Sequence, residues 1–128
     1  MRIFKNKEFV RFARKARISD AVLCKAVMNA EKGLIDADLG GGVIKQRVAR
    51  EGGGKSGGFR TMILFRTGTR AFFVYGFAKN ERDNIELDEL TEFRRLAAIM
   101  LNYSDAELEY AIQNNRLTEV TYEDKTIS

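Results

Sequence analysis

The spacing of apolar residues changes twice along this chain, and each change limits the secondary structure that can form there. Over residues 7–33 the apolar side chains recur at helical spacing, over 43–77 they form strand-like runs, and from 86 onward the spacing is helical again. This order predicts an α+β domain, and 128 residues suffice for one domain with its own core.

Two consecutive helices are predicted in the first quarter of the chain. Residues 7–17 place four apolar side chains on one helical face, namely Phe9, Phe12, Ala13 and Ala16. A second helix begins near Ser19, a good N-cap, and ends near Gly33. Its apolar face is expected to comprise Leu23, Ala26, Val27 and Ala30. The short joint predicts a helical hairpin, and Met1–Phe4 before it is expected to form an edge strand.

Three strands are predicted next, as an antiparallel meander over residues 43–77. "VIKQRVA" alternates, with Lys45 and Arg47 on one face and Ile44 and Val48 on the other. "FRTMILFR" and "RAFFVYGF" are joined by "TGT", where Gly68 permits a tight turn. Their nearly continuous apolar character indicates central strands covered on both faces, with the helical hairpin packed on one of them.

Helices return after Asn80. Residues 86–102 carry Leu90, Phe93, Ala97 and Met100 on one side of a helix. "SDAE" at 104–107 is a capping box that opens a short last helix to about Asn115, and "RLTEVTY" is a candidate terminal strand. The expected order is therefore βαα, βββ, αα(β), with a main domain over 1–102 and a C-terminal helical extension and tail over 103–128.

The charge is distributed unevenly. Residues 1–80 contain 17 Lys and Arg against 6 Asp and Glu, a balance of +11, whereas residues 81–128 contain 5 against 12, a balance of −7. A basic body of this size attracts polyanions, nucleic acid first. The alternative is a charge that serves solubility, with an acidic tail.

Composition excludes several chemistries. Without histidine, acid–base work falls to Lys, Glu, Asp, Tyr or water, and a Ser-His-Asp or Cys-His nucleophile is excluded. No zinc site is expected, since the chain has no His and one Cys, and no other metal or cofactor is predicted. Cys24 is interpreted as a small packed hydrophobe in a reduced cytoplasm. No apolar run is long enough to cross a bilayer, so no membrane partner is expected.

Residues 40–60, "GGGVIKQRVAREGGGKSGGFR", hold eight of the eleven glycines and five cations. Within them "AREGGGKS" (49–56) approaches the nucleotide phosphate-loop pattern, with Ala49 in place of the first glycine. Such a loop needs a helix directly after it, whose N-terminus receives the phosphates. Here "GGFRTMILF" predicts a strand, so we interpret the match as a coincidence.

The cations of the predicted sheet form a more informative set. Lys45 and Arg47 share a strand face, Arg60 begins the next strand and Lys79 follows the third. If the meander brings them to one concave face, with Lys55 on the loop above, they suit a phosphodiester and the extra charge of its pentavalent transition state. The alternative is a set of exposed strand charges.

The segments "GGGVIKQRVAREGGGKSGGFRTMILF" and "VYGFAKNERDNI" resemble the middle of the RelE/ParE superfamily of bacterial toxins, in particular its HigB-type branch. The resemblance covers roughly residues 1–102 and implies a βααβββα RelE-like fold. It also implies a toxin of a type II toxin-antitoxin system that cuts mRNA on the ribosome, by attack of a ribose 2′-OH on the adjacent phosphate.

The same resemblance implies roles for individual residues. Arg60 and Lys79 match transition-state stabilisers, Lys45 a phosphate binder or proton acceptor, and Arg47 the second member of a basic pair. Lys55 and Arg50 are expected to bind RNA. Glu81 is a second candidate base or, alternatively, an ion-pair partner of Arg82 or Lys79. Asn80 and Glu86 stand where RelE itself has an arginine and a tyrosine, as suits the HigB-type branch.

Two other functions are alternatives to the nuclease. ParE-like members of the fold inhibit DNA gyrase and generally lack the nuclease residues, and a degenerate relative would only bind its partner. The partners implied for the nuclease are a helix-turn-helix antitoxin, the ribosome and mRNA, with operator DNA reached only through the antitoxin.

Overall fold

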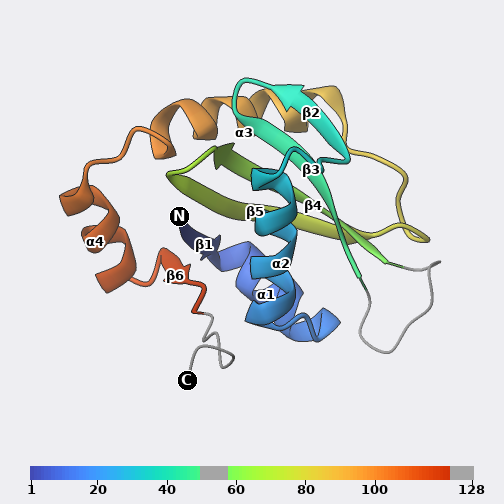
Figure 1. Cartoon of the computed structure of the whole chain (residues 1–128), viewed down its shortest axis with the longest axis horizontal. Coiled ribbons are helices and arrows are strands. Elements are labelled where there is room, and N and C mark those ends of the chain that lie inside the picture. The colour runs from blue at the N-terminus through green and yellow to red at the C-terminus, as the bar shows by residue number, and fades with distance from the viewer. Residues whose placement is uncertain (50–57, 122–128) are drawn as a thin grey trace.

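Within its described residues, the chain forms one six-stranded sheet with helices on both faces (Figure 1). The structure is a computed structural model that describes residues 1–49 and 58–121. The strands lie in the order β2-β3-β4-β5-β1-β6. Their bounds are β1 Arg2–Asn6, β2 Ala37–Gly40, β3 Val43–Val48, β4 Phe59–Arg66, β5 Arg70–Ala78 and β6 Leu117–Glu119. The sheet is mixed, since β1 pairs in parallel with β5 and the other pairs are antiparallel.

The helices begin and end where local capping signals stand in the sequence. They are α1 Lys7–Ala16, α2 Asp20–Glu31, α3 Leu87–Met100 and α4 Asp105–Gln113. The Ser19 side chain accepts the Val22 N–H at the start of α2, and Ser104 and Glu107 form the expected capping box of α4. Gly33 follows α2 with φ of +83°, a conformation that favours glycine. Since α1 is followed after three residues by α2, the predicted helical hairpin is confirmed.

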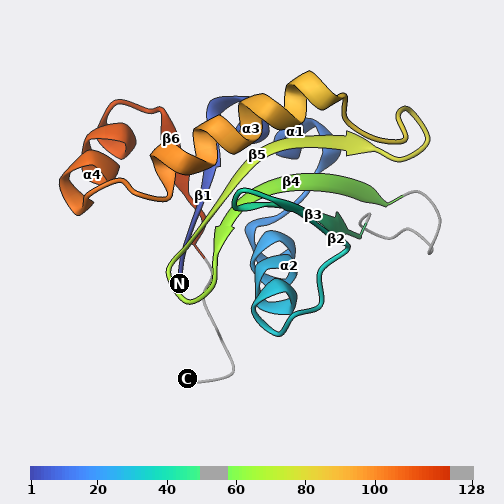
Figure 2. The same cartoon turned by 90° about the horizontal axis from the view of Figure 1, so that it is seen from above.

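Helices α2 and α3 lie on opposite sides of the sheet (Figure 2), and an apolar cluster of side chains fills the space on each side. The first lies under α1 and α2 and contains all four residues expected on the apolar face of α2, Leu23, Ala26, Val27 and Ala30. The second lies under α3 and α4 and includes Met62, Val74 and Ala97. Because β4 and β5 contribute to both clusters, these central strands are covered on both faces, as their apolar runs predicted.

The predicted meander is present as β3, β4 and β5, but the sheet is wider than predicted. Strand β2 was missed, since it is short and its sequence, "ADLG", precedes two more glycines. Gly40, Gly41 and Gly42 all have positive φ; Gly40 ends β2, and Gly41 and Gly42 form the turn that joins β2 to β3. The first three glycines of the 40–60 segment are thus a hairpin turn.

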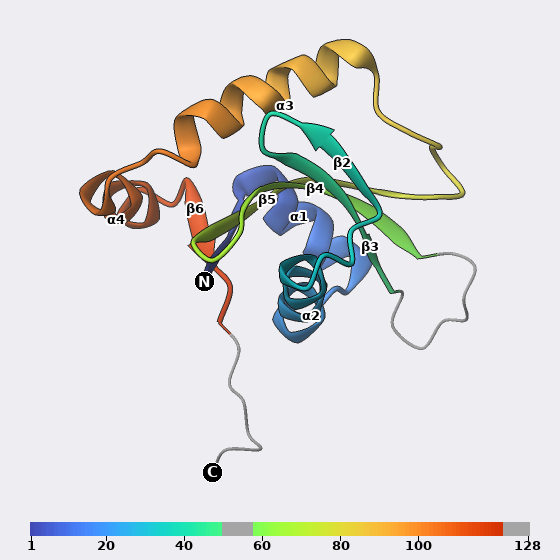
Figure 3. The same ribbon diagram turned by 45° about the horizontal axis from the view of Figure 1, so that its top comes forward.

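The placement of Met1–Phe4 as an edge strand was wrong. Strand β1 lies between β5 and β6, because β6 pairs with it in antiparallel register. Helix α4 and β6 lie at the end of the molecule away from the C-terminal end of β3 (Figure 3). Leu108 of α4 and Leu117 of β6 are buried in the second apolar cluster. A division of the chain at residue 102 stays a prediction.

No helix in the described part of the chain has the length and apolar character that a membrane span requires.

Candidate functional site

The register of β3 against β4 places three cationic side chains on one face of the sheet. Arg47 is the cross-strand partner of Arg60, and Lys45 is the partner of Met62. Directly opposed residues point to the same face, and Met62 belongs to the cluster under α3. Lys45, Arg47 and Arg60 therefore share the α3 face, as the alternation of "VIKQRVA" predicted for the first two.

All three cations converge on one carboxylate, that of Asp36. Arg60 Nε lies 3.4 Å from Asp36 Oδ2, Lys45 Nζ lies 4.0 Å from the same oxygen, and Arg47 Nε lies 3.9 Å from Asp36 Oδ1. We call these four residues the cation cluster. Asp36 stands in the bend just before β2.

A buried amide holds Asp36 at this position. The Gln46 side chain is on the opposite face of β3 from Lys45 and is 4% exposed. Its Nε2 donates to the carbonyls of Ala26 and Leu34, both at 2.9 Å, and its Oε1 accepts the Asp36 N–H at 3.0 Å. The segment from 34 to 36 is thereby fastened to both α2 and β3.

The three cations differ in their access to solvent. The side chain of Arg60 is 10% exposed and that of Lys45 is 18% exposed, whereas that of Arg47 is 68% exposed. Arg60 is thus packed at the base of the cluster and Arg47 at its rim. A guanidinium that is held by its surroundings presents its planar fork to a phosphate with little loss of conformational entropy.

Two of the other predicted site residues are outside the described part of the chain, and a third, Lys79, lies in the turn that follows β5. Lys55 and Arg50 fall within 50–57, so the structure says nothing of them. Lys79 is exposed in the turn after β5, and its N–H donates to the Gly58 carbonyl at 3.4 Å. This contact puts Lys79 at the end of the sheet where β4 begins, one residue past the pair formed by Phe59 and Ala78.

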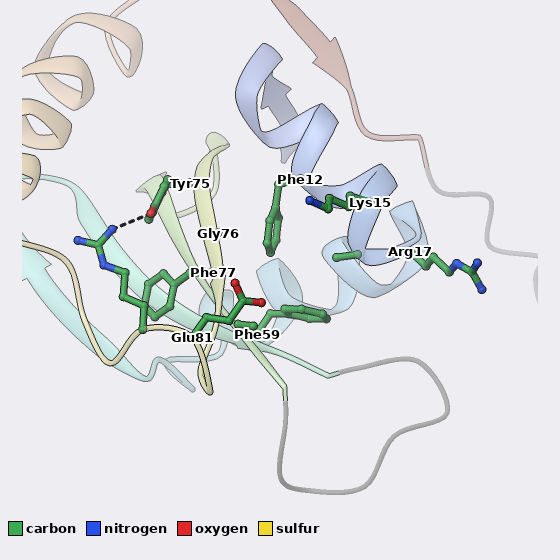
Figure 4. Close-up of a pocket in the computed structure, with 11 residues that line it drawn as sticks. Phe12, Lys15, Arg17, Phe59, Tyr75, Gly76, Phe77 and Glu81 are labelled. Carbon is green, nitrogen blue, oxygen red and sulfur yellow. Dashed lines mark hydrogen bonds between the residues drawn. The ribbon is translucent and has the colours of Figure 1, made fainter.

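Glu81 lies apart from the cation cluster, in a groove of about 930 Å³ beside the C-terminal half of β5 (Figure 4). Side chains of α1, β4 and β5 line this groove together with Glu81, among them Phe12, Lys15, Phe59 and Phe77. The carboxylate of Glu81 points into it, toward the edge-to-face pair of the Phe12 and Phe59 rings (Figure 4). Gly76 is required here, because a Cβ on it would lie 2.3 Å from the Phe12 ring.

In the described part of the chain, Arg82 is paired with a carboxylate other than that of Glu81, and the role of Glu81 stays a prediction. Arg82 pairs with Glu89 on α3, and it also donates to the Tyr75 hydroxyl at 2.7 Å. These hydrogen bonds, the one to Glu89 first, raise the pKa of Arg82, and the hydrogen bond that Glu89 accepts from Arg82 lowers the pKa of Glu89. Arg82 thus fastens the turn after β5 to α3, and its charge is neutralised within the protein.

Asp36 and Gln46 are the residues that sequence reasoning missed. A weak signal was available for Gln46, since it is a polar residue on the apolar face of an alternating strand, between Ile44 and Val48. No signal in the sequence indicated Asp36, because an aspartate between a helix and a run of glycines is common in turns. Only the fold brings it to the cations.

The cluster can bind and stabilise anions electrostatically. Three cations within 4.0 Å of one carboxylate form a site that attracts a second anion, and a phosphodiester oxygen has the same preference for guanidinium and ammonium groups. Within residues 1–49 and 58–121, no group of three or more His, Cys, Asp or Glu side chains is arranged to hold a metal ion.

The family model described as "RelE toxin of RelE / RelB toxin-antitoxin system" matches residues 1–120. None of the curated proteins matches the chain. The family match therefore includes α4 and β6, beyond the 1–102 range of the resemblance noted in the sequence.

Proposed function

The chain belongs to the RelE toxin family of toxin-antitoxin systems, and from this we propose that it is an endoribonuclease that cleaves mRNA on the ribosome. Membership makes it a toxin with an antitoxin partner. The target and the reaction are our proposal, as are its HigB-type character and its place in the cytoplasm, where ribosomes are found.

The observation that carries the proposal is the convergence of Lys45, Arg47 and Arg60 on one oxyanion. A phosphodiester placed at this cluster meets two guanidinium groups and one ammonium group. In the proposed reaction a ribose 2′-oxygen attacks the adjacent phosphorus, and the bond from phosphorus to the 5′-oxygen breaks. The proton lost by the 2′-OH and the proton gained by the 5′-oxygen are exchanged with solvent, so the products are a cyclic phosphate and a 5′-OH.

The proposed roles are supported by the positions of the side chains. Arg60, buried and fixed, stabilises the additional charge of the pentavalent transition state, because preorganised donors act most strongly on charge that develops there. Lys45 binds the phosphate, and Arg47 at the rim contacts it or its neighbour. Lys79, exposed at the same end of the sheet, contributes a further positive charge. Lys55 and Arg50 are assigned to RNA binding from the resemblance alone.

Glu81 is less suited to act as the base, because it lines the groove at β5 and forms no ion pair with the cluster among the described residues. For the partner, we propose a helix-turn-helix antitoxin that covers the cluster with acidic side chains or blocks access to the ribosome. The +11 balance of residues 1–80 favours fast, salt-sensitive association with such a partner.

The test compares Arg60→Ala with Arg116→Ala on purified ribosomes programmed with mRNA. Arg116 is an exposed arginine between α4 and β6, remote from the cluster, so its loss changes the net charge equally. A charge-assisted contact made in the transition state is worth roughly 3 kcal/mol, so Arg60→Ala should slow cleavage by about 10²–10³ and Arg116→Ala by less than about twofold.

Two further measurements separate the alternatives. Arg60→Lys keeps the charge without the planar fork and should still lose at least about tenfold, provided that both variants unfold cooperatively like the wild type. Pulse labelling after induced expression should show loss of amino-acid incorporation first. Early loss of thymidine incorporation would instead favour gyrase as the target, and undiminished cleavage by Arg60→Ala would refute the proposed site.

A further inference from the structure

We propose that Asp36 is a positioning residue of the cation cluster. Its carboxylate holds Lys45, Arg47 and Arg60 together before RNA binds and leaves the terminal nitrogens of both arginines free for the phosphate. This inference rests on the proposed function for its effect on catalysis, whereas the arrangement of Arg60 that it describes can be measured without any reaction.

The three cations need a counter-ion in order to stand where they do. Arg47 and Arg60 are directly opposed across two antiparallel strands, and like charges in such a pair destabilise a sheet. Lys45 shares their face. Among residues 1–49 and 58–121, Asp36 is the one carboxylate within 4.0 Å of any of these three cationic groups. It therefore offsets a repulsion that would otherwise spread the side chains apart.

The contacts are arranged so that the phosphate-binding groups stay available. In both arginines the nitrogen closest to Asp36 is Nε, at 3.4 Å for Arg60 and 3.9 Å for Arg47. A bidentate contact with a phosphate can then use the terminal nitrogens of the fork. These distances also exceed the usual range of hydrogen bonds, about 2.7–3.2 Å. Asp36 thus orients the two guanidinium groups and leaves their terminal nitrogens available for hydrogen bonds with the phosphate.

Asp36 is itself supported by groups that do not belong to the cluster. Its N–H donates to the buried Gln46 amide, which in turn donates to carbonyls of α2 and of the 34–36 segment. Asp36 is followed directly by β2, in which Ala37 pairs with Lys45 of β3. A site residue keeps its geometry when neighbouring packing and hydrogen bonds fix it in this way.

If Asp36 positions the cations, removal of its charge should reduce turnover but not weaken the binding of RNA. Without the Asp36 charge, Arg60 loses its orientation, and misplacement of a catalytic group by about 1 Å can reduce the rate by about 10². The cluster at the same time becomes more positive by one charge, so attraction to RNA is retained or increased. For Asp36→Asn we expect kcat to fall by about 10–100-fold, with KM for programmed ribosomes unchanged or lower.

The control variant is Asp38→Asn. Asp38 lies two residues further on, in β2, and its Oδ1 accepts the Gly40 N–H at 2.9 Å, a bond that asparagine retains. It forms no ion pair with the cluster among the described residues. The substitution removes the same charge from the same strand region, and we expect both kcat and KM to stay within about twofold of the wild type.

The second measurement uses nuclear magnetic resonance of the Arg60 side chain, assigned by comparison with Arg60→Lys. In the wild type we expect a distinct Nε–H signal that moves when inorganic phosphate is added. In Asp36→Asn the signal should shift toward that of a solvated arginine, and Asp38→Asn should leave it in place. Thermal unfolding of each variant confirms that a change at Arg60 is not a loss of the fold.

The outcomes separate the two proposals. If the wild type does not cleave mRNA on ribosomes, the proposed function fails, and the Arg60 signal alone decides the role of Asp36. An unchanged Arg60 signal in Asp36→Asn would overturn the inference, as would a raised KM with unchanged kcat. It would also be overturned if Asp36→Asn removed the acidic limb of the pH–rate profile and Asp36→Glu restored it, since Asp36 would then be the proton acceptor.

Discussion

Replacement of the buried amide at position 46 tests how the site is built. Gln46→Leu keeps a similar volume on the apolar face of β3, but removes three hydrogen bonds, to Asp36, Leu34 and Ala26. The Ala26 carbonyl lies inside α2 and retains its helical partner. The Asp36 N–H and the Leu34 carbonyl lose theirs.

The expected loss of stability follows from these two orphaned groups. A buried polar group without a partner costs about 1–3 kcal/mol. Leu34 and Asp36 are both exposed residues, so water replaces part of each bond and the lower end of the range, about 1 kcal/mol for each group, applies. We expect Gln46→Leu to reduce the free energy of unfolding by about 2 kcal/mol, which for a domain of this size lowers Tm by roughly 6–10 °C.

The assay is urea unfolding followed by circular dichroism, with Gln113→Leu as the control. Gln113 is exposed at the end of α4, so the same change of residue type there should shift the free energy by less than about 0.5 kcal/mol. A midpoint for Gln46→Leu equal to that of the wild type, with an equal slope, would refute the reasoning, because the amide would then not hold the 34–36 segment.

Three other substitutions test separate features of the fold. Gly76→Ala brings a Cβ to 2.3 Å from the Phe12 ring and should cost about 1–3 kcal/mol in urea unfolding; full stability would show that the ring moves freely into the groove. The Arg2 hydrogen bond lowers the pKa of Glu119, so its contribution to stability is present above the ordinary carboxyl pKa and is lost as the pH falls below about 4. Glu119→Gln should therefore flatten the acid limb of the Tm–pH curve, and an unchanged limb would contradict this. Ser104→Ala removes the cap of α4 and should cost about 1 kcal/mol by the same unfolding assay, whereas no loss would mean that the capping box does not stabilise α4.

The helices and the central strands could be predicted because their signals are local. Ser19 and Ser104 cap helices within four residues of themselves, and Gly68 permits the turn between two apolar runs. The alternation in β3 decided which face carries Lys45 and Arg47. The pairing of β1 with β5 could not be predicted from local signals, because strands of similar apolar character do not indicate which distant strand they pair with.

The sequence by itself therefore determined the elements, their order and the side chains that one strand presents together. Only the tertiary structure decided that β6 covers β1, that Arg60 stands opposite Arg47, and that Asp36 meets both. The physical reason is distance along the chain. Periodicity and capping act over a few residues, whereas the cation cluster forms through strand register, and its counter-ion is delivered by a bend that a buried amide fastens from the other face of the sheet.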